Sequence, residues 1–159
     1  MKSKILLGAV VSVVAIAACG SDNSVTVQST TYATTLTGAK ERPNPNASTA
    51  TGTATFLMVG STLNYTVNAT GLSANITGSH IHVGSADVSG GIVSDLTQSG
   101  TQTGIVISGS INLAAPIVRG TSTITGDSLK VLLNNGNAYV NIHTSTYPGG
   151  EIRGNLTKL

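Results

Sequence analysis

The three histidines of this 159-residue chain are the residues whose spacing could do chemistry. His80 and His82 stand two apart in the run Ser-His-Ile-His-Val-Gly, and His143 ends the run Tyr-Val-Asn-Ile-His. In a strand, side chains two residues apart share a face and lie about 7 Å apart along the chain. Both runs therefore place imidazole on one face and branched aliphatic residues on the other. If both aliphatic faces pack on one core, the three imidazoles point the same way.

Three imidazoles on one surface are suited to bind a transition metal. Copper leads on affinity for imidazole, so the sequence predicts one copper ion on His80, His82 and His143, with zinc as the second choice. Three such ligands with an open fourth position are also a workable zinc arrangement. The competing interpretation is a structural network, in which the histidines make hydrogen bonds to Asn141, Glu151 or backbone groups. The sequence leaves both interpretations open.

After a Pro-Gly-Gly turn at residues 148–150, the chain returns with two charged residues, Glu151 and Arg153. Both are predicted to lie on the polar face. A functional role would make Glu151 an acceptor that orients an imidazole N–H, and Arg153 a cation that attracts an anion. A structural role would make them an ion pair worth about 0–1 kcal/mol, and this role is favoured. Asn141 is predicted to tie down a loop backbone.

Few other residues point to catalysis. Asp87 and Asp95 are the acids near the first histidine pair, and we expect them to solvate turns. The sequence has no paired-carboxylate motif, no phosphate-binding glycine loop and no G-x-S-x-G motif. It also has no basic patch with interleaved aromatic residues, which argues against a nucleic-acid partner. The sequence therefore favours a protein that is not an enzyme.

The composition favours strands and turns. The chain has 19 glycines, one phenylalanine and no tryptophan, and its many Thr and Val residues favour strands while Asn favours turns. We expect an all-β fold: an antiparallel, Greek-key-like β-sandwich or a partly closed barrel with one short helix. Besides the two histidine runs, strands are predicted over residues 30–36, 50–59, 62–68, 92–96 and 104–113, with a hairpin turn at Gly60-Ser61.

One stretch has a helical pattern. Asp127 is predicted to cap its start and Asn135-Gly136 to end it, and its leucines recur at i, i+3 and i+4 (Leu129, Leu132 and Leu133). Two further stretches are predicted to be connections. Residues 40–46 contain two prolines and three charges, which is typical of a surface loop. Residues 114–126 are predicted to be a weaker connection.

The N-terminus is predicted to lie outside the fold. Two lysines, an apolar run over residues 5–18 and small residues before a lone Cys19 resemble the lipobox of bacterial lipoproteins. We expect residues 1–19 to be a signal peptide that is cut before Cys19, whose lipid then anchors the protein; the alternative is an ordinary cleaved signal. Residues 20–32 are then a tether and 33–159 the domain. Removal of the signal peptide takes away Lys2 and Lys4. Six of the eight basic residues then remain beside six acidic ones, so the expected formal net charge of the mature chain is zero.

Several of these pieces together resemble the CHRD domain, a family named after chordin and found in many bacterial secreted proteins. The pattern departs from the family at Glu41, which is followed by Arg-Pro-Asn-Pro instead of two adjacent prolines. The resemblance covers residues 33–159 and implies an extracytoplasmic β-domain. It is carried by residues 36–43, 50–52, 80–84, the leucine-rich helix, 139–144 and 148–154.

A more distant similarity concerns the histidines. His-x-His followed by a later histidine resembles the copper side of copper/zinc superoxide dismutases. That resemblance implies copper at His80, His82 and His143, and it gives Arg153 the place of the arginine that guides the anion. The chain has no fourth histidine to bridge a second metal. The implied site therefore holds one metal ion and keeps an open position.

Two functional hypotheses follow. The first is an extracytoplasmic, membrane-anchored CHRD-domain lipoprotein of the cell envelope, on the periplasmic face or the cell surface, that acts as a binding or structural module. Its partners would be the membrane, reached through the lipid on Cys19, and an envelope or extracellular protein. The second is a mononuclear copper-binding protein, which in its sharpest form is redox-active like a superoxide dismutase. Convergence of the three imidazoles would favour the second.

Overall fold

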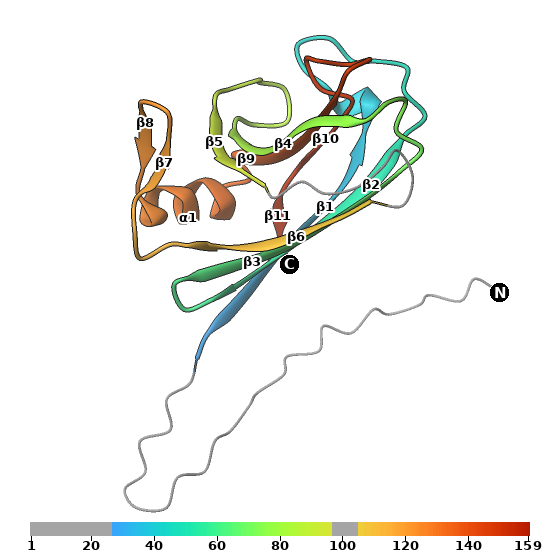
Figure 1. The fold of residues 1–159 in the computed structure, drawn as a ribbon. Coiled ribbons are helices and arrows are strands. Elements are labelled where there is room, and N and C mark those ends of the chain that lie inside the picture. The colour runs from blue at the N-terminus through green and yellow to red at the C-terminus, as the bar shows by residue number, and fades with distance from the viewer. Residues whose placement is uncertain (1–26, 97–104) are drawn as a thin grey trace, which may run out of the picture.

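The computed structural model describes residues 27–96 and 105–159, which form an antiparallel all-β fold with one helix (Figure 1). Nine strands make one curled sheet in the order β5-β4-β9-β10-β1-β2-β3-β6, and β11 pairs with β1. The predicted all-β class is confirmed, in the form of an open half-barrel (Figure 1). The strands of this sheet are β1 (Ser29–Thr37), β2 (Thr51–Val59), β3 (Thr62–Thr70), β4 (Ile76–Val83), β5 (Ile92–Asp95), β6 (Ile105–Asn112), β9 (Ala138–Thr144), β10 (Ile152–Asn155) and β11 (Thr157–Lys158).

The predicted hairpin at Gly60-Ser61 joins β2 to β3. Gly60 has a φ of 58°, which L side chains rarely adopt, and the pairing begins at Val59 opposite Thr62. Along β3, exposed polar residues alternate with buried apolar ones, as the period of a half-buried strand requires. Local alternation therefore decides which face of this strand lies on the core.

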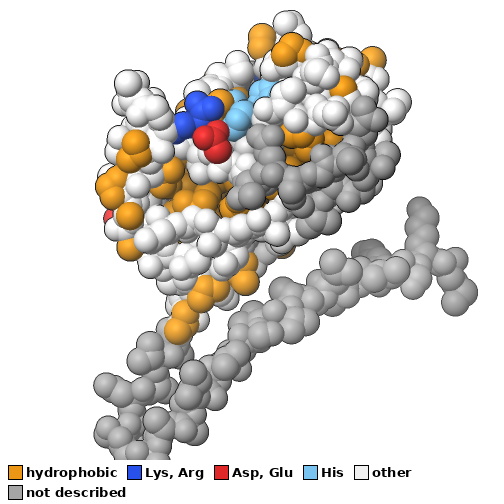
Figure 2. Space-filling model, in the orientation of Figure 1, with side chains coloured by type: hydrophobic (Ala, Val, Ile, Leu, Met, Phe, Trp, Pro, Cys, Tyr) orange, Lys and Arg blue, Asp and Glu red, His pale blue; other side chains and the backbone are white. Residues whose placement is uncertain are grey.

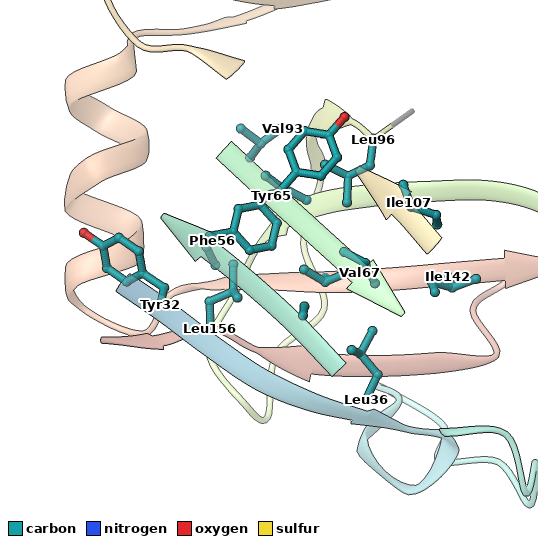
Figure 3. Packing of buried hydrophobic residues seen from close by; sticks show 14 of the residues in the cluster. Tyr32, Leu36, Phe56, Tyr65, Val67, Val93, Leu96, Ile107, Ile142 and Leu156 are labelled. Atoms are coloured by element: carbon teal, nitrogen blue, oxygen red, sulfur yellow. The ribbon is translucent and has the colours of Figure 1, made fainter. Parts of the chain in front are cut away.

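The core fills the inner face of the curled sheet. Phe56 on β2 and Tyr65 on β3 stack with their ring centroids 5.7 Å apart, and Figure 3 shows Tyr65 near Val93 and Leu96 from the β5 region. Four aliphatic residues of the two histidine strands and of β10 are fully buried in the same cluster (Ile81, Val140, Ile142 and Ile152), whereas Val83 at the end of β4 is 36% exposed. The expectation that both aliphatic faces pack on one core is thus confirmed.

The two histidine strands are direct neighbours. β4 pairs antiparallel with β9, with His80 opposite Asn141, His82 opposite Tyr139 and Gly78 opposite His143. Because paired residues project to the same side of a sheet, all three imidazoles lie on the face that points away from the core. Loops cover this outer face, so that Tyr139 is only 2% exposed.

The predicted helix is present as α1 (Gly126–Asn134), with Leu129 and Leu133 buried against the core. Its predicted cap is wrong. Thr125, not Asp127, is the N-cap: its backbone is extended and its side chain accepts a hydrogen bond from the Ser128 amide. Asp127 lies in the first turn and forms an exposed ion pair with Lys130 at 3.0 Å.

The structure corrects both predicted connections. Within residues 114–126 lies a two-stranded ribbon of β7 (Ile117–Arg119) and β8 (Ser122–Ile124), whose three-residue strands are too short to show alternation. In the 40–46 loop, Glu41 is only 3% exposed, although the three charged residues of this loop were expected at the surface. Both corrections arise from contacts with distant parts of the chain.

The predicted signal peptide, the lipidation site Cys19 and residues 20–26 of the predicted tether lie outside the described residues. Among the residues that are described, no helix has the length and apolar character needed to cross a membrane.

Candidate metal centre

The outer face of β4 and β9 brings the three histidines together. One ring nitrogen from each of His80, His82 and His143 lies within 4.8 Å of the others. The ring centroids are 4.9 Å apart for His80 and His143, and 5.6 Å apart for His80 and His82. Three imidazoles from two adjacent strands thus form one cluster.

Backbone carbonyls fix the orientation of two of these rings. His82 Nδ1 lies 2.9 Å from the Gly90 carbonyl, and His143 Nδ1 lies 3.0 Å from the Pro148 carbonyl. A carbonyl only accepts hydrogen bonds, so each Nδ1 carries the proton and donates it. In both rings Nε2 is then the unprotonated nitrogen, and in both it is buried without a hydrogen-bond partner.

His80 is turned the other way. Its Nε2 faces the Asp95 carboxylate at 3.4 Å, while its Nδ1 is buried without a partner. Arg119 on β7 donates through Nε to the same carboxylate at 2.8 Å. The three free nitrogens are therefore Nδ1 of His80 and Nε2 of His82 and His143.

Asp95 is a neighbour of the histidine group that sequence reasoning missed. It was expected to solvate a turn, but it ends strand β5 directly opposite His80. A carboxylate that accepts the second N–H of a metal-binding imidazole is a common arrangement, because it fixes the ring and raises its basicity. A strand was predicted over residues 92–96, but nothing in the sequence says that it pairs with β4.

Burial keeps the imidazoles neutral. It lowers the pKa of all three rings below the usual 6.5, and in His80 burial and the neighbouring His143 and His82 bring the pKa to about 4. The neutral ring is the form that binds a metal ion. At neutral pH the free nitrogens therefore need not lose a proton to coordinate.

The cluster reaches the surface at one edge. Figure 2 shows histidine atoms at the surface beside a basic and an acidic side chain. The His80 side chain is 13% exposed, while Asp95 and Arg119 are 60% and 40% exposed. Solvent can therefore reach the group from this side.

Gly78 leaves room for the rings. A Cβ at this position would lie 2.6 Å from Cε1 of His80 and 3.6 Å from Cδ2 of His143. A side chain there would push against the His80 ring, so the glycine makes close approach of the two strands' imidazoles possible.

Arg153 lies inside the protein, 1% exposed. Its guanidinium carbon is 3.5 Å from the centre of the Tyr139 ring, and its Nη2 donates to the carbonyls of Ser85 at 2.7 Å and Val88 at 2.9 Å. The predicted role of an anion-attracting residue does not fit this buried position. The structural interpretation expected an ion pair between Arg153 and Glu151. The ion pairs of the described residues do not include one.

Glu151 is fully buried and contacts hydroxyl groups, not an imidazole. Its carboxylate accepts hydrogen bonds from Ser48 Oγ at 2.8 Å, Thr144 Oγ1 at 2.6 Å, and both the amide and Oγ of Ser73 at 2.8 and 2.9 Å. Burial raises the pKa of this carboxyl, but these hydrogen bonds outweigh it and hold the pKa below its usual value. Glu151 therefore joins three segments of the fold.

Asn141 contacts a side chain, where a loop backbone was predicted. Its Nδ2 donates to Glu41 Oε2 at 3.2 Å. Burial raises the pKa of Glu41 to about 7, although the hydrogen bond from Asn141 and the charge of Arg153 oppose this shift. Because Asn141 pairs with His80, the buried Glu41 lies against the same outer face of the sheet as the histidines.

Replacing Glu41 with Gln should change how stability depends on pH. Glu41 has a pKa near 4.5 when unfolded and about 7 when folded, so folding takes up a proton between these values and stability is lost as pH rises through them. Glutamine stays neutral, so Glu41→Gln should gain roughly 3 kcal/mol over the wild type between about pH 4 and about pH 8. Urea unfolding at both pH values measures this gain. A constant difference between the two proteins would contradict it.

The fold and the site define a small all-β domain that presents three converging imidazoles on its outer face. The family model of the CHRD domain matches residues 32–156, and the chain belongs to this family. No curated protein and no solved structure matches the chain. The resemblance found in the sequence is thereby confirmed, whereas the distant likeness to copper/zinc superoxide dismutases stays a prediction.

Proposed function

We propose that the domain binds one copper ion through Nδ1 of His80 and Nε2 of His82 and His143. Two observations carry the proposal: one ring nitrogen from each histidine lies within 4.8 Å of the others, and each ring has one buried nitrogen without a hydrogen-bond partner. A purely structural network would use them, because an unsatisfied buried polar atom costs about 1–3 kcal/mol. A metal ion satisfies all three at once.

The distances suit a metal after a small contraction. Metal–nitrogen bonds of 2.0–2.1 Å in a trigonal or tetrahedral site separate the nitrogens by about 3.3–3.6 Å. One nitrogen from each ring lies within 4.8 Å of the others, so ring movements of about 1 Å bring three nitrogens to these distances. The Gly90, Pro148 and Asp95 oxygens already hold the opposite sides of the rings.

Copper fits this donor set best, with zinc second. All three ligands are neutral imidazoles, and for such sites the affinity of divalent ions rises to copper and then falls at zinc. Three protein ligands leave a position open at the exposed edge, where a small molecule could bind and redox chemistry could follow. A lipid on Cys19 would hold this site at the cell envelope, where we propose that it acts.

Tyrosine fluorescence tests the proposal. The chain has four tyrosines and no tryptophan, and the Tyr139 ring stacks on His82 with centroids 4.8 Å apart. Bound Cu²⁺ should quench this emission in a saturable way that ends at one equivalent. The full-length chain in detergent is titrated with Cu²⁺, and with Zn²⁺ as a competitor that does not quench. Quenching that rises without saturation would show that copper has no site here.

A further inference from the structure

We infer that Arg153 is a positioning residue for His82, which it holds in the metal-binding tautomer through Tyr139 and the 85–90 loop. The consequence for metal binding depends on the proposed function. The effect on the His82 ring does not, because the geometry that fixes the ring is present without a metal. Arg153 then positions a histidine ring from inside the protein and does not attract an anion at the surface.

The first connection runs through the loop backbone. Arg153 Nη2 donates to the carbonyls of Ser85 and Val88, at 2.7 and 2.9 Å. The Val88 amide donates back to the Ser85 carbonyl at 3.2 Å and closes a turn. Two residues later, the Gly90 carbonyl accepts the Nδ1–H of His82. Arg153 thus holds the segment that carries the acceptor of His82.

The second connection runs through Tyr139. The strands lie in the order β4-β9-β10, so Tyr139 on β9 stands between His82 on β4 and Arg153 on β10. Its ring stacks on the His82 ring with 12° between their planes, and it meets the guanidinium of Arg153 at 3.5 Å. The Gly90 amide donates to the Tyr139 hydroxyl at 3.2 Å, and the hydroxyl donates to the Gly90 carbonyl, which also accepts from His82, at 3.3 Å. The phenol and the His82 imidazole are therefore held by the same glycine.

The charge of Arg153 makes this arrangement costly unless every contact is present. The side chain is 1% exposed, and no carboxylate of the described residues lies within ion-pair distance of it. Burial of an unpaired charge costs several kcal/mol; the carbonyls that Nη2 reaches and the aromatic face offset part of this cost, while Nε and Nη1 have no hydrogen-bond partner. Lysine does not reproduce this arrangement, because an ammonium group lacks the flat guanidinium face that lies over the Tyr139 ring.

The direct test observes the histidine tautomers in the metal-free, full-length chain by long-range ¹H–¹⁵N NMR. In the wild type we expect His82 and His143 as Nδ1–H tautomers and His80 as the Nε2–H tautomer. In Arg153→Lys, the His82 signals should shift toward a mixture of tautomers. His143 should stay unchanged, because its acceptor, the Pro148 carbonyl, lies in another loop. Copper affinity should fall by about tenfold, as for other residues that orient a metal ligand.

Arg42→Lys is the matched control. Arg42 reaches the same loop from outside through an ion pair with Asp87 at 3.4 Å, and such pairs contribute little, so His82 should not change. If Arg153→Lys does not fold, Tyr139→Phe decides: it removes the two hydroxyl contacts that hold Gly90, the acceptor of His82, and should shift His82 in the same direction, by less. An unchanged His82 ring in a folded variant overturns the inference. Failure of the wild type to bind copper would overturn only the proposed function.

Discussion

Replacing His80, His82 and His143 together with alanine is expected to abolish tight copper binding and to raise the Kd by at least about a thousandfold. Such a loss corresponds to about 4 kcal/mol, a fraction of the total that three nitrogen ligands can supply to a bound metal. The protein has no other group of three histidine, cysteine or acidic residues with this geometry among its described residues. Calorimetry on both full-length proteins measures the stoichiometry and the affinity.

The triple variant needs a control for folding, because His82 is 7% exposed and packs on Tyr139. Far-UV circular dichroism and urea unfolding of the two proteins provide it. His143→Ala alone should give an intermediate loss, since two imidazoles remain. Equal and weak binding by the wild type and the folded triple variant would contradict the metal site, and the histidines would then be residues of the fold.

Glu151→Ala is expected to cost about 3–5 kcal/mol of stability, the largest effect of a single change on the fold. The carboxylate is fully buried and accepts hydrogen bonds from Ser48, Ser73 and Thr144. Removing it leaves four donors without a partner, each at a cost of about 1–3 kcal/mol before relaxation. Urea unfolding at neutral pH measures the loss.

Two controls make the Glu151 result specific. Glu151→Gln keeps the shape and one acceptor oxygen, so it should lose about half as much stability. Asp127→Ala removes a carboxylate whose side chain is 88% exposed and pairs with Lys130. Such exposed ion pairs contribute about 0–1 kcal/mol. If Glu151→Ala and Asp127→Ala cost the same, the buried carboxylate does not join the three segments in the way the hydrogen bonds indicate.

The strand pattern around the histidines was fixed locally and could be predicted. Alternation of imidazole and aliphatic residues along β4 and β9 follows from the two-residue period of a strand, so the polar and core faces followed from the residues alone. The same reasoning located the hairpin at Gly60 and the leucine-rich helix. Its cap was missed because Thr125 and Asp127 are both good cap residues, and only the backbone conformation at Thr125 decides between them.

What only the tertiary structure decided is which distant residues meet. β4 and β9 are some 60 residues apart in the chain, and their register places Gly78 opposite His143. β5 brings Asp95 to His80, and β10 places Arg153 under Tyr139. Such pairings depend on the packing of the whole sheet, because a polar residue on a strand is compatible with many neighbours. The sequence therefore determined the histidine face, and the sheet order determined the oxygens and the arginine that hold its rings.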